Sequence, residues 1–223
     1  MNEPLTHYYD KRAAEYEAIY LKPERQADLQ ALVKILQDIF HGTEVLEIAC
    51  GTGFWTQKIA ETASRILATD INESVLEVAR SKSYSAQNVQ FEQADLYEIR
   101  SEQIWPNLFG GFIWSHIKVE ELGHFVDKVN SLVRPGGTVV FVDNRYVAGS
   151  STPIAEQDAQ GNTFQNRFLK DGTAHRVLKN FPEREELEQV LAGKSHNFQY
   201  TALQYFWVCS YQTLITDPVE SAP

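Results

Sequence analysis

The segment 45–56 constrains the fold of this chain more than any other, because closely spaced glycines join an apolar run to a helical pattern. Residues 45–49 are apolar except for one carboxylate, Glu47, and Gly51 and Gly53 follow directly. Glycine has no Cβ atom and readily adopts positive φ angles, so these residues permit a sharp turn and let a ligand approach the backbone. Glu47 favours a ligand with a cationic or hydroxyl group, whereas a phosphate loop would carry a lysine. We therefore expect a ligand-binding strand–turn–helix unit here.

Strand-like and helix-like segments alternate around this unit. A helix that opens at Pro23 carries apolar residues at helical spacing until Gly42. The patterns then predict strands at 44–49, 65–69, 88–92, 111–115 and 138–143, helices at 54–62, from 72 onward and at 119–133, and a turn containing Trp105 and Pro106. Consecutive βα units of this kind predict a doubly wound, Rossmann-like α/β fold with a mostly parallel sheet.

The alternation changes after residue 145. Residues 163–169 and 173–179 have strand-like composition and flank Asp171-Gly172, a dipeptide that supplies the positive φ of a tight turn. We interpret them as an inserted β-hairpin, followed by a helix from Pro182 and two closing strands at 198–203 and 205–213. The interpretation divides a single domain into N-terminal cap helices (1–42), a core (43–145), an inserted loop and hairpin (146–181), and a closing helix with strands (182–216).

Composition excludes several classes of function. The chain has 223 residues with a formal net charge of −10, and no run rich in lysine or arginine offsets the acids, so we expect no nucleic-acid partner. It has two cysteines, Cys50 and Cys209, and no CxxC or histidine-rich cluster, so we expect neither disulfides nor a metal site. No apolar run approaches the length of a membrane helix. We expect a cytoplasmic monomer or homodimer with no membrane partner.

The pattern Glu-x-Ala-Cys-Gly-Thr-Gly resembles the cofactor loop of class I S-adenosylmethionine-dependent methyltransferases, acidic-x-Gly-x-Gly-x-Gly, with Ala49 in place of the first glycine. Asp70 and Asp95 follow the second and third predicted strands, as acids do in that family. Together these matches span about residues 40–145. The resemblance implies a seven-stranded, mostly parallel sheet with an antiparallel C-terminal strand. It also implies S-adenosyl-L-methionine as cofactor and S-adenosyl-L-homocysteine as product.

The resemblance assigns roles to residues at successive strand ends. It places Glu47, Gly51 and Gly53 under the methionine and ribose of the cofactor, Asp70 at both ribose hydroxyls and Asp95 at the adenine amino group. A carboxylate that accepts two hydroxyls forms charge-assisted hydrogen bonds, which agrees with this role for Asp70. The full set of predicted cofactor-binding residues is Tyr9, Arg12, Tyr16, Glu47, Ala49, Cys50, Gly51, Gly53, Trp55, Thr56, Asp70, Ile71, Asp95, Leu96 and Ser115.

The acceptor side of the predicted site is less defined. His116 follows the fourth strand and either takes a proton from the acceptor or caps the next helix. Trp114 and the strand-five residues Arg145 and Tyr146 are predicted to bind the acceptor, and Arg145 suggests an anionic one. The hairpin either covers the acceptor or serves as scaffold. Its small size suits a small-molecule acceptor.

Other functions stay open at this point. A nicotinamide-binding Rossmann domain would need glycine at position 56, where Thr56 stands, and gives no reason for Glu47 or Asp95. A protein or RNA methyltransferase is disfavoured by the acidic charge and the small insert. A non-catalytic protein that binds S-adenosylmethionine is the third alternative.

Overall fold

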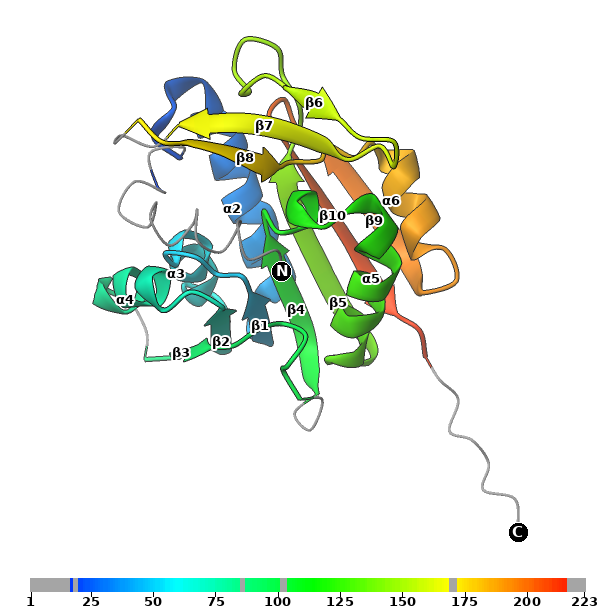
Figure 1. Cartoon of the computed structure of the whole chain (residues 1–223). Coiled ribbons are helices and arrows are strands. Elements are labelled where there is room, and N and C mark those ends of the chain that lie inside the picture. Colours follow the sequence, from blue (N-terminus) through cyan, green and yellow to red (C-terminus); the bar gives the residue numbers. More distant parts are fainter. Residues whose placement is uncertain (1–16, 18–19, 85–86, 101–103, 169–171, 216–223) are drawn as a thin grey trace.

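The computed structural model describes residues 17, 20–84, 87–100, 104–168 and 172–215 and contains a central sheet between two layers of helices (Figure 1). Seven strands form this sheet in the order β3-β2-β1-β4-β5-β10-β9. Neighbouring strands from β3 to β5 are parallel, and β10 runs antiparallel to both of its neighbours. The predicted seven-stranded, mostly parallel sheet with an antiparallel C-terminal strand is confirmed. The strands are β1 (Glu44–Ile48), β2 (Arg65–Asp70), β3 (Val89–Gln93), β4 (Trp105–Gly111), β5 (Val133–Asn144), β9 (Ser195–Ala202) and β10 (Phe206–Thr213).

Successive residues of the strands supply two separate cores, since strand side chains point alternately to opposite faces. Val45 and Phe109 belong to the core under one helical layer, whereas Leu46 and Leu108 belong to the other. The helices of the first core are α2 (Gln26–Phe40), α3 (Phe54–Ala60) and α4 (Glu73–Ser81), and those of the second are α5 (Leu122–Ser131) and α6 (Arg184–Leu191). Short 3-10 helices are η2 (Pro23–Arg25), η3 (Trp114–His116) and η4 (Val119–Glu121).

The predicted position of the fourth strand is wrong. Trp105 and Pro106, predicted to lie in a turn, begin β4, and the residues after Gly111 leave the sheet. The pairing of β4 with β5 shifts between Trp105 and Asn107, so the proline, which cannot donate a ladder hydrogen bond, lies at this irregularity. Gly110 is needed near the strand end, because a Cβ atom there would lie 2.7 Å from the Phe141 ring.

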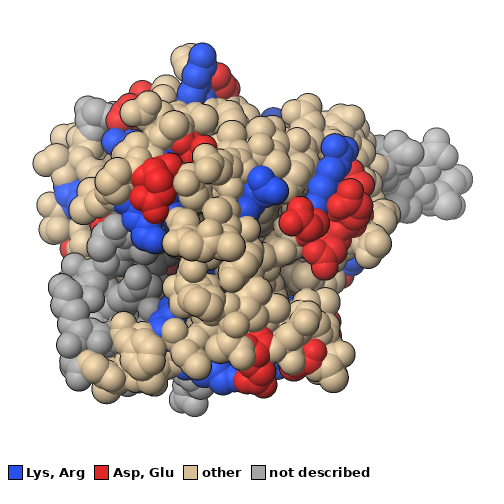
Figure 2. All heavy atoms as spheres, turned by 90° about the horizontal axis from the view of Figure 1, so that it is seen from above, with Lys and Arg blue, Asp and Glu red and all other residues tan. Residues whose placement is uncertain are grey.

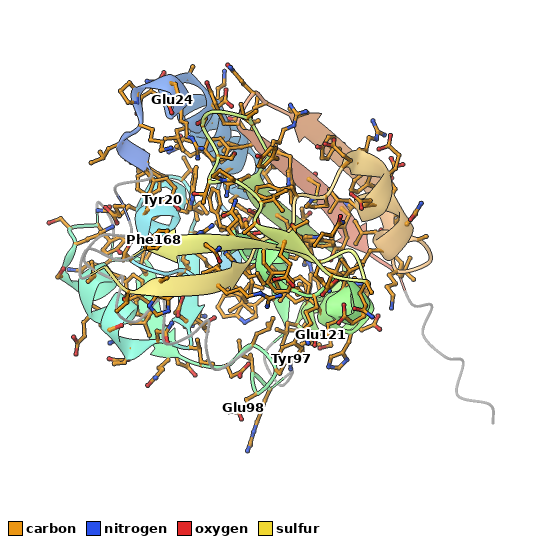
Figure 3. The ribbon with its side chains drawn as sticks, turned by 45° about the horizontal axis from the view of Figure 1, so that its top comes forward. Tyr20, Glu24, Tyr97, Glu98, Glu121 and Phe168 are labelled. Atoms are coloured by element: carbon orange, nitrogen blue, oxygen red, sulfur yellow. The ribbon has the colours of Figure 1, made fainter. Side chains whose placement is uncertain are left out.

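A second, three-stranded sheet crosses above the edge of the main sheet where the parallel strands end (Figure 1). It consists of β6 (Glu156–Gln157), β7 (Thr163–Phe168) and β8 (Ala174–Leu178). The sequence predicted β7 and β8 as a hairpin and missed the two-residue strand β6. We call the β7–β8 pair the ribbon. The end of β7, marked by Phe168, lies toward the side of the molecule that carries Tyr20 (Figure 3).

Candidate functional site

The loop after β1 turns sharply through three residues with positive φ angles. Ala49, Gly51 and Gly53 have φ values of 52°, 55° and 76°. Gly53 also has no room for a side chain, because a Cβ atom would lie 2.7 Å from the Tyr84 hydroxyl oxygen. The N–H of Gly53 donates to the Cys50 carbonyl at 3.0 Å, and α3 begins at the next residue. Backbone geometry and close packing thus explain the glycines, and Ala49 adopts the left-handed conformation without being one.

Asp70 ties the end of β2 to this loop. Its Oδ2 accepts the backbone N–H of Gly51 at 2.9 Å, and its Oδ1 accepts that of Asn72 at 2.9 Å. The side chain is 8% exposed, and burial raises its pKa although the two N–H groups act in the opposite direction. A carboxylate oxygen can accept more than one hydrogen bond, so Asp70 can shape the loop and still bind a hydroxyl of a ligand.

Glu47 lies buried beside the loop, with 1% of its surface exposed. Its Oε2 has no hydrogen-bond partner among the described residues. Burial raises the pKa of Glu47 to about 8, and the nearby Thr56 hydroxyl only partly offsets this effect. A buried carboxyl without a partner is costly when ionised, so this position suits a ligand that brings a positive charge or a hydrogen-bond donor.

The predicted adenine-side residues follow β2 and β3 at the same edge of the sheet. Asp95 is half-buried, and its Oδ1 accepts the N–H of Tyr97 at 2.9 Å. Leu96 is buried and Ile71 is half-buried. The N–H of Ala94 donates to the Asp70 carbonyl at 2.9 Å, which holds the two strand ends together. The structure therefore brings the acids at the ends of these strands to one side of the loop.

Trp55 and Thr56 are buried in the first turn of α3. The Trp55 ring lies edge-on to Tyr20, with centroids 6.0 Å apart, and is nearly parallel to the ring of Phe112. These contacts place Trp55 in the core. Cys50 is also buried, and burial raises the pKa of its thiol well above the usual value. Both cysteines are free thiols.

A buried polar cluster at the ends of β4 and β5 contains the predicted Ser115 and two residues that the sequence reasoning missed, Asp143 and Lys179. Lys179 donates from Nζ to Asp143 Oδ1 at 2.8 Å and to Ser115 Oγ at 2.5 Å. The Ser115 N–H donates to Asp143 Oδ2 at 3.0 Å. Burial raises the pKa of Asp143, but the charge and hydrogen bond of Lys179, together with His116 and the Ser115 N–H, outweigh burial and lower that pKa. The position of Asp143 at the end of a strand was a usable sequence signal, whereas its pairing with Lys179 was not.

His116 contacts the base of the ribbon. Its Nδ1 lies 2.6 Å from the carbonyl oxygen of Leu178. A carbonyl can only accept, so Nδ1 carries the proton and, in the neutral ring, Nε2 carries the lone pair. Burial, together with the charges of Lys179 and Arg167, lowers the pKa of His116 well below 6.5. The imidazole is therefore neutral at pH 7 and can accept a proton at Nε2.

The three predicted acceptor residues separate into two groups. Arg145 donates from Nη1 to the Leu203 carbonyl at 2.7 Å, so its guanidinium contacts the segment between β9 and β10. Trp114 and Tyr146 line one cavity of about 370 Å³, together with residues of the ribbon base and of α6. Tyr146 packs edge-on against Phe181 in the cavity wall, with ring centroids 5.3 Å apart.

The predicted cofactor residues Tyr9, Arg12 and Tyr16 lie outside the described residues. The neighbouring Glu17 is described, and its carboxylate accepts the hydroxyl of Thr52 at 2.8 Å and forms an ion pair with Lys82. The chain just before η2 thus contacts the glycine loop.

The surface above the sheet edge carries bases and acids in small, mixed groups among uncharged residues (Figure 2). In the described part of the chain, no group of three or more His, Cys, Asp or Glu side chains could hold a metal ion. Within the same residues, no helix is long and apolar enough to cross a membrane.

Comparisons with known proteins agree with this geometry. A family model described as a methyltransferase domain matches residues 45–137. Demethylmenaquinone methyltransferase of Staphylococcus aureus (strain JH9) is 26% identical over 165 residues, which cover 67% of this chain and 66% of that relative, just under two thirds of its length. The DhpI–SAH complex is 27% identical with a TM-score of 0.78 and covers 95% of this chain and 96% of that one. The DhpI–SAM–HEP complex is 26% identical with a TM-score of 0.74, covering 95% and 99%.

Proposed function

Because the chain belongs to the class I S-adenosylmethionine-dependent methyltransferases, we propose that it transfers the methyl group of S-adenosyl-L-methionine to a small-molecule acceptor. One observation carries the proposal: the buried carboxylate of Asp70 holds the glycine loop while facing the same strand-end edge as Glu47 and Asp95. Ligands of doubly wound sheets bind at this edge. Relatives in complex with SAM and SAH support S-adenosyl-L-methionine as the cofactor.

The cofactor would lie across the ends of β1, β2 and β3. Asp70 would accept the ribose hydroxyls and Asp95 the adenine amino group, with Ile71 and Leu96 beside the ring. The buried, unpartnered oxygen of Glu47 would accept a donor on the ribose or methionine part. Each assignment uses a carboxylate where the cofactor offers hydrogen-bond donors.

Methyl transfer is an in-line displacement, in which a lone pair of the acceptor attacks the methyl carbon while the carbon–sulfur bond breaks. The bonding electrons stay on sulfur, and the positively charged sulfonium becomes the neutral thioether S-adenosyl-L-homocysteine. If the attacking atom carries a proton, His116 Nε2 would accept it, since the ring is neutral and Nδ1 is engaged with Leu178. The rest of the catalysis would be alignment and exclusion of water.

A small acceptor is supported by the compact ribbon above the strand ends and by the relatives. The name of the relative from Staphylococcus aureus identifies a demethylmenaquinone methyltransferase, and one DhpI complex contains HEP as well as SAM. The acceptor would approach between the ribbon and the ends of β4 and β5, where His116 and Ser115 lie. Trp114 and Tyr146 would then extend the site into the cavity that they line.

Calorimetry with S-adenosylhomocysteine, followed by methyl uptake from pooled metabolites, tests the proposal. We expect S-adenosylhomocysteine to bind and NAD not to bind. His116→Asn, whose side-chain amide can still donate to Leu178, should bind S-adenosylhomocysteine normally but lose about 10²–10⁴-fold in turnover with an acceptor that must lose a proton. The exposed His41→Asn serves as control.

Three results would change the conclusion. Clear NAD binding without S-adenosylhomocysteine binding would refute the assignment of the cofactor. S-adenosylhomocysteine binding without methyl uptake from any pool would favour the non-catalytic alternative. Full turnover by His116→Asn would show that His116 is not the general base.

A further inference from the structure

Two buried basic side chains reach the last residues of β5 from different parts of the chain. Lys179, just after β8, pairs with Asp143, and Arg25, in η2, donates from Nη1 to the Asn144 carboxamide oxygen at 3.4 Å. Arg25 is 7% exposed and Lys179 is 4% exposed. Both cations are thus withdrawn from water at the strand end where the proposed acceptor enters.

Arg25 is poorly compensated for a buried cation. Its Nη2 donates to two oxygens of Ser150, the hydroxyl Oγ at 3.1 Å and the carbonyl at 3.4 Å. Its Nε has no acceptor among the described residues. The aromatic rings of Tyr205 and Phe206 lie below the guanidinium, with centroids 5.5 and 5.7 Å from Cζ. Aromatic faces stabilise a cation but leave its N–H donors unsatisfied.

No carboxylate in the described part of the chain comes within ion-pair distance of Arg25. The nearest acids have other partners. Asp28 accepts the N–H of Tyr205 at 2.7 Å, and Glu24 is exposed and accepts the Ser150 hydroxyl at 3.2 Å. Within the described residues, Lys179 contacts a buried carboxylate, that of Asp143, and Arg25 does not. Glu24 and Asp28 act on Arg25 through their charges but do not contact it, so the described residues give this buried cation no carboxylate in direct contact, which is an expensive arrangement unless a ligand supplies one.

The ribbon adds a third base on the face that covers this region. Gln165 pairs with Val177 across the ribbon, and both are buried, so their side chains point inward. Arg167 and His175 form a pair two residues further along each strand, and because side chains alternate between faces they point to the same side. Arg167 donates to Gln165 Oε1 at 2.8 Å from Nη2. Burial lowers the pKa of His116 most, and the charges of Lys179 and Arg167 lower it further, whereas the charge of Asp143 acts in the opposite direction. The charges of Arg167 and Arg25 both act on Lys179, so three basic groups lie near this strand end in a protein of net charge −10.

We propose that the methyl acceptor carries an anionic group, a carboxylate or a phosphate-type oxyanion, which binds Arg25 at the end of β5 beside the Lys179–Asp143 pair. The inference rests on the proposed function, since it names the chemical class of the acceptor for that site. Guanidinium binds planar or tetrahedral oxyanions through two parallel N–H donors. In Arg25, Nε is unpartnered among the described residues, and an anion that replaces Ser150 at Nη2 would complete such a pair. The competing explanation is structural: Arg25 only holds η2 against the rings of Tyr205 and Phe206.

NMR of the arginine Nε–H groups distinguishes these explanations. S-adenosylhomocysteine binding is measured first, and the protein with and without it is then titrated with inorganic phosphate or acetate, with chloride at equal ionic strength as reference. We expect the Arg25 Nε–H signal, identified by its loss in Arg25→Lys, to shift saturably with phosphate or acetate and not with chloride. The anion that binds more tightly then identifies the oxyanion type.

Variants supply the second readout. Arg25→Gln should weaken anion binding at least about tenfold, in line with the loss of a charge-assisted pair, and leave S-adenosylhomocysteine affinity unchanged. Arg65→Gln is a matched control, because Arg65 also lies over an aromatic ring, that of Trp105, at the opposite end of the strands. If Arg25→Gln fails to fold, Arg25→Lys provides the test instead. Lysine keeps the positive charge but loses the paired N–H donors, so this variant should still bind the anion, but more weakly than wild type.

An Arg25 signal that ignores both anions while S-adenosylhomocysteine binds would overturn the anionic acceptor and leave the methyltransferase proposal intact. Anion binding that survives Arg25→Gln unchanged would overturn it as well. Absence of S-adenosylhomocysteine binding would instead count against the proposed function, whatever the anions do.

Discussion

Glu47→Gln should stabilise the ligand-free protein in a way that depends on pH. The pKa of Glu47 is raised from 4.5 to about 8 by burial. Between these values the unfolded chain has lost the proton that the folded protein keeps, so the unfolded state binds fewer protons and wild-type stability falls as pH rises. Glutamine has nearly the same shape and no charge, so the variant does not share this loss.

The size of the effect follows from the shift in pKa. One pKa unit corresponds to about 1.4 kcal/mol, so the full contribution from pH 4.5 to 8 is on the order of 5 kcal/mol, and at pH 7 it is about 3 kcal/mol. For a protein of this length, 1 kcal/mol changes the melting temperature by about 2–4 °C. We therefore expect Glu47→Gln to melt roughly 6–12 °C above wild type at pH 7 and close to wild type at pH 4.5.

Thermal or urea unfolding of both proteins from pH 4.5 to 8, without cofactor, measures the difference. Glu92→Gln, an exposed change on the neighbouring strand β3, is the control and should follow the wild-type profile. Parallel profiles for wild type and Glu47→Gln across this range would refute the reasoning, because they would mean that the Glu47 carboxyl titrates alike in folded and unfolded chains.

Three further predictions concern the loop and the ribbon. Asp70→Ala should weaken S-adenosylhomocysteine binding by ~1.5–3 kcal/mol, the range for a hydrogen bond to a charged group, whereas the exposed Asp38→Ala should not; equal dissociation constants would place Asp70 outside the site. Gly53→Val should bind still more weakly by the same calorimetry, because the new side chain would collide with the Tyr84 hydroxyl at a φ of 76°; normal affinity would show that the loop is misplaced. Replacing residues 164–177 by a short Gly-Ser link should leave S-adenosylhomocysteine affinity nearly unchanged and abolish or broaden methyl transfer; unaltered acceptor preference would make the ribbon scaffold.

Local patterns in the sequence were sufficient for the cofactor half of the molecule. Strand, glycine turn and helix follow one another within residues 45–56, Asp70 comes directly after the second predicted strand, and Asp95 comes shortly after the third. Since parallel strands end at one edge of the sheet, the order along the chain already implied that these residues meet. The sheet predicted from that pattern is confirmed by the structure, and the matching methyltransferase-domain model and the relatives solved with SAH and SAM support the predicted family and cofactor.

Local patterns failed where a residue type occurs both in turns and in strands, because only the pairing of the strands distinguishes the two cases. Pro106 signals a turn in most contexts, yet here it lies at an irregularity near the start of β4, where the missing N–H costs no regular ladder bond. The two-residue strand β6 is too short to leave a periodic signal, and it forms because β7 lies beside it.

The acceptor half was decided by tertiary structure. Lys179 and Asp143 are separated by 36 residues, and Arg25 and Asn144 by 119, so no local periodicity or spacing connects them. Arg145, which the sequence suggested as the cation of the acceptor site, donates to Leu203, and its role at the acceptor stays a prediction. Arg25, which the sequence did not suggest, is buried with its Nε lacking an acceptor among the described residues. Whether a basic side chain is solvated, paired or left for a ligand depends on its burial and on the groups around it, and these are properties of the folded chain alone.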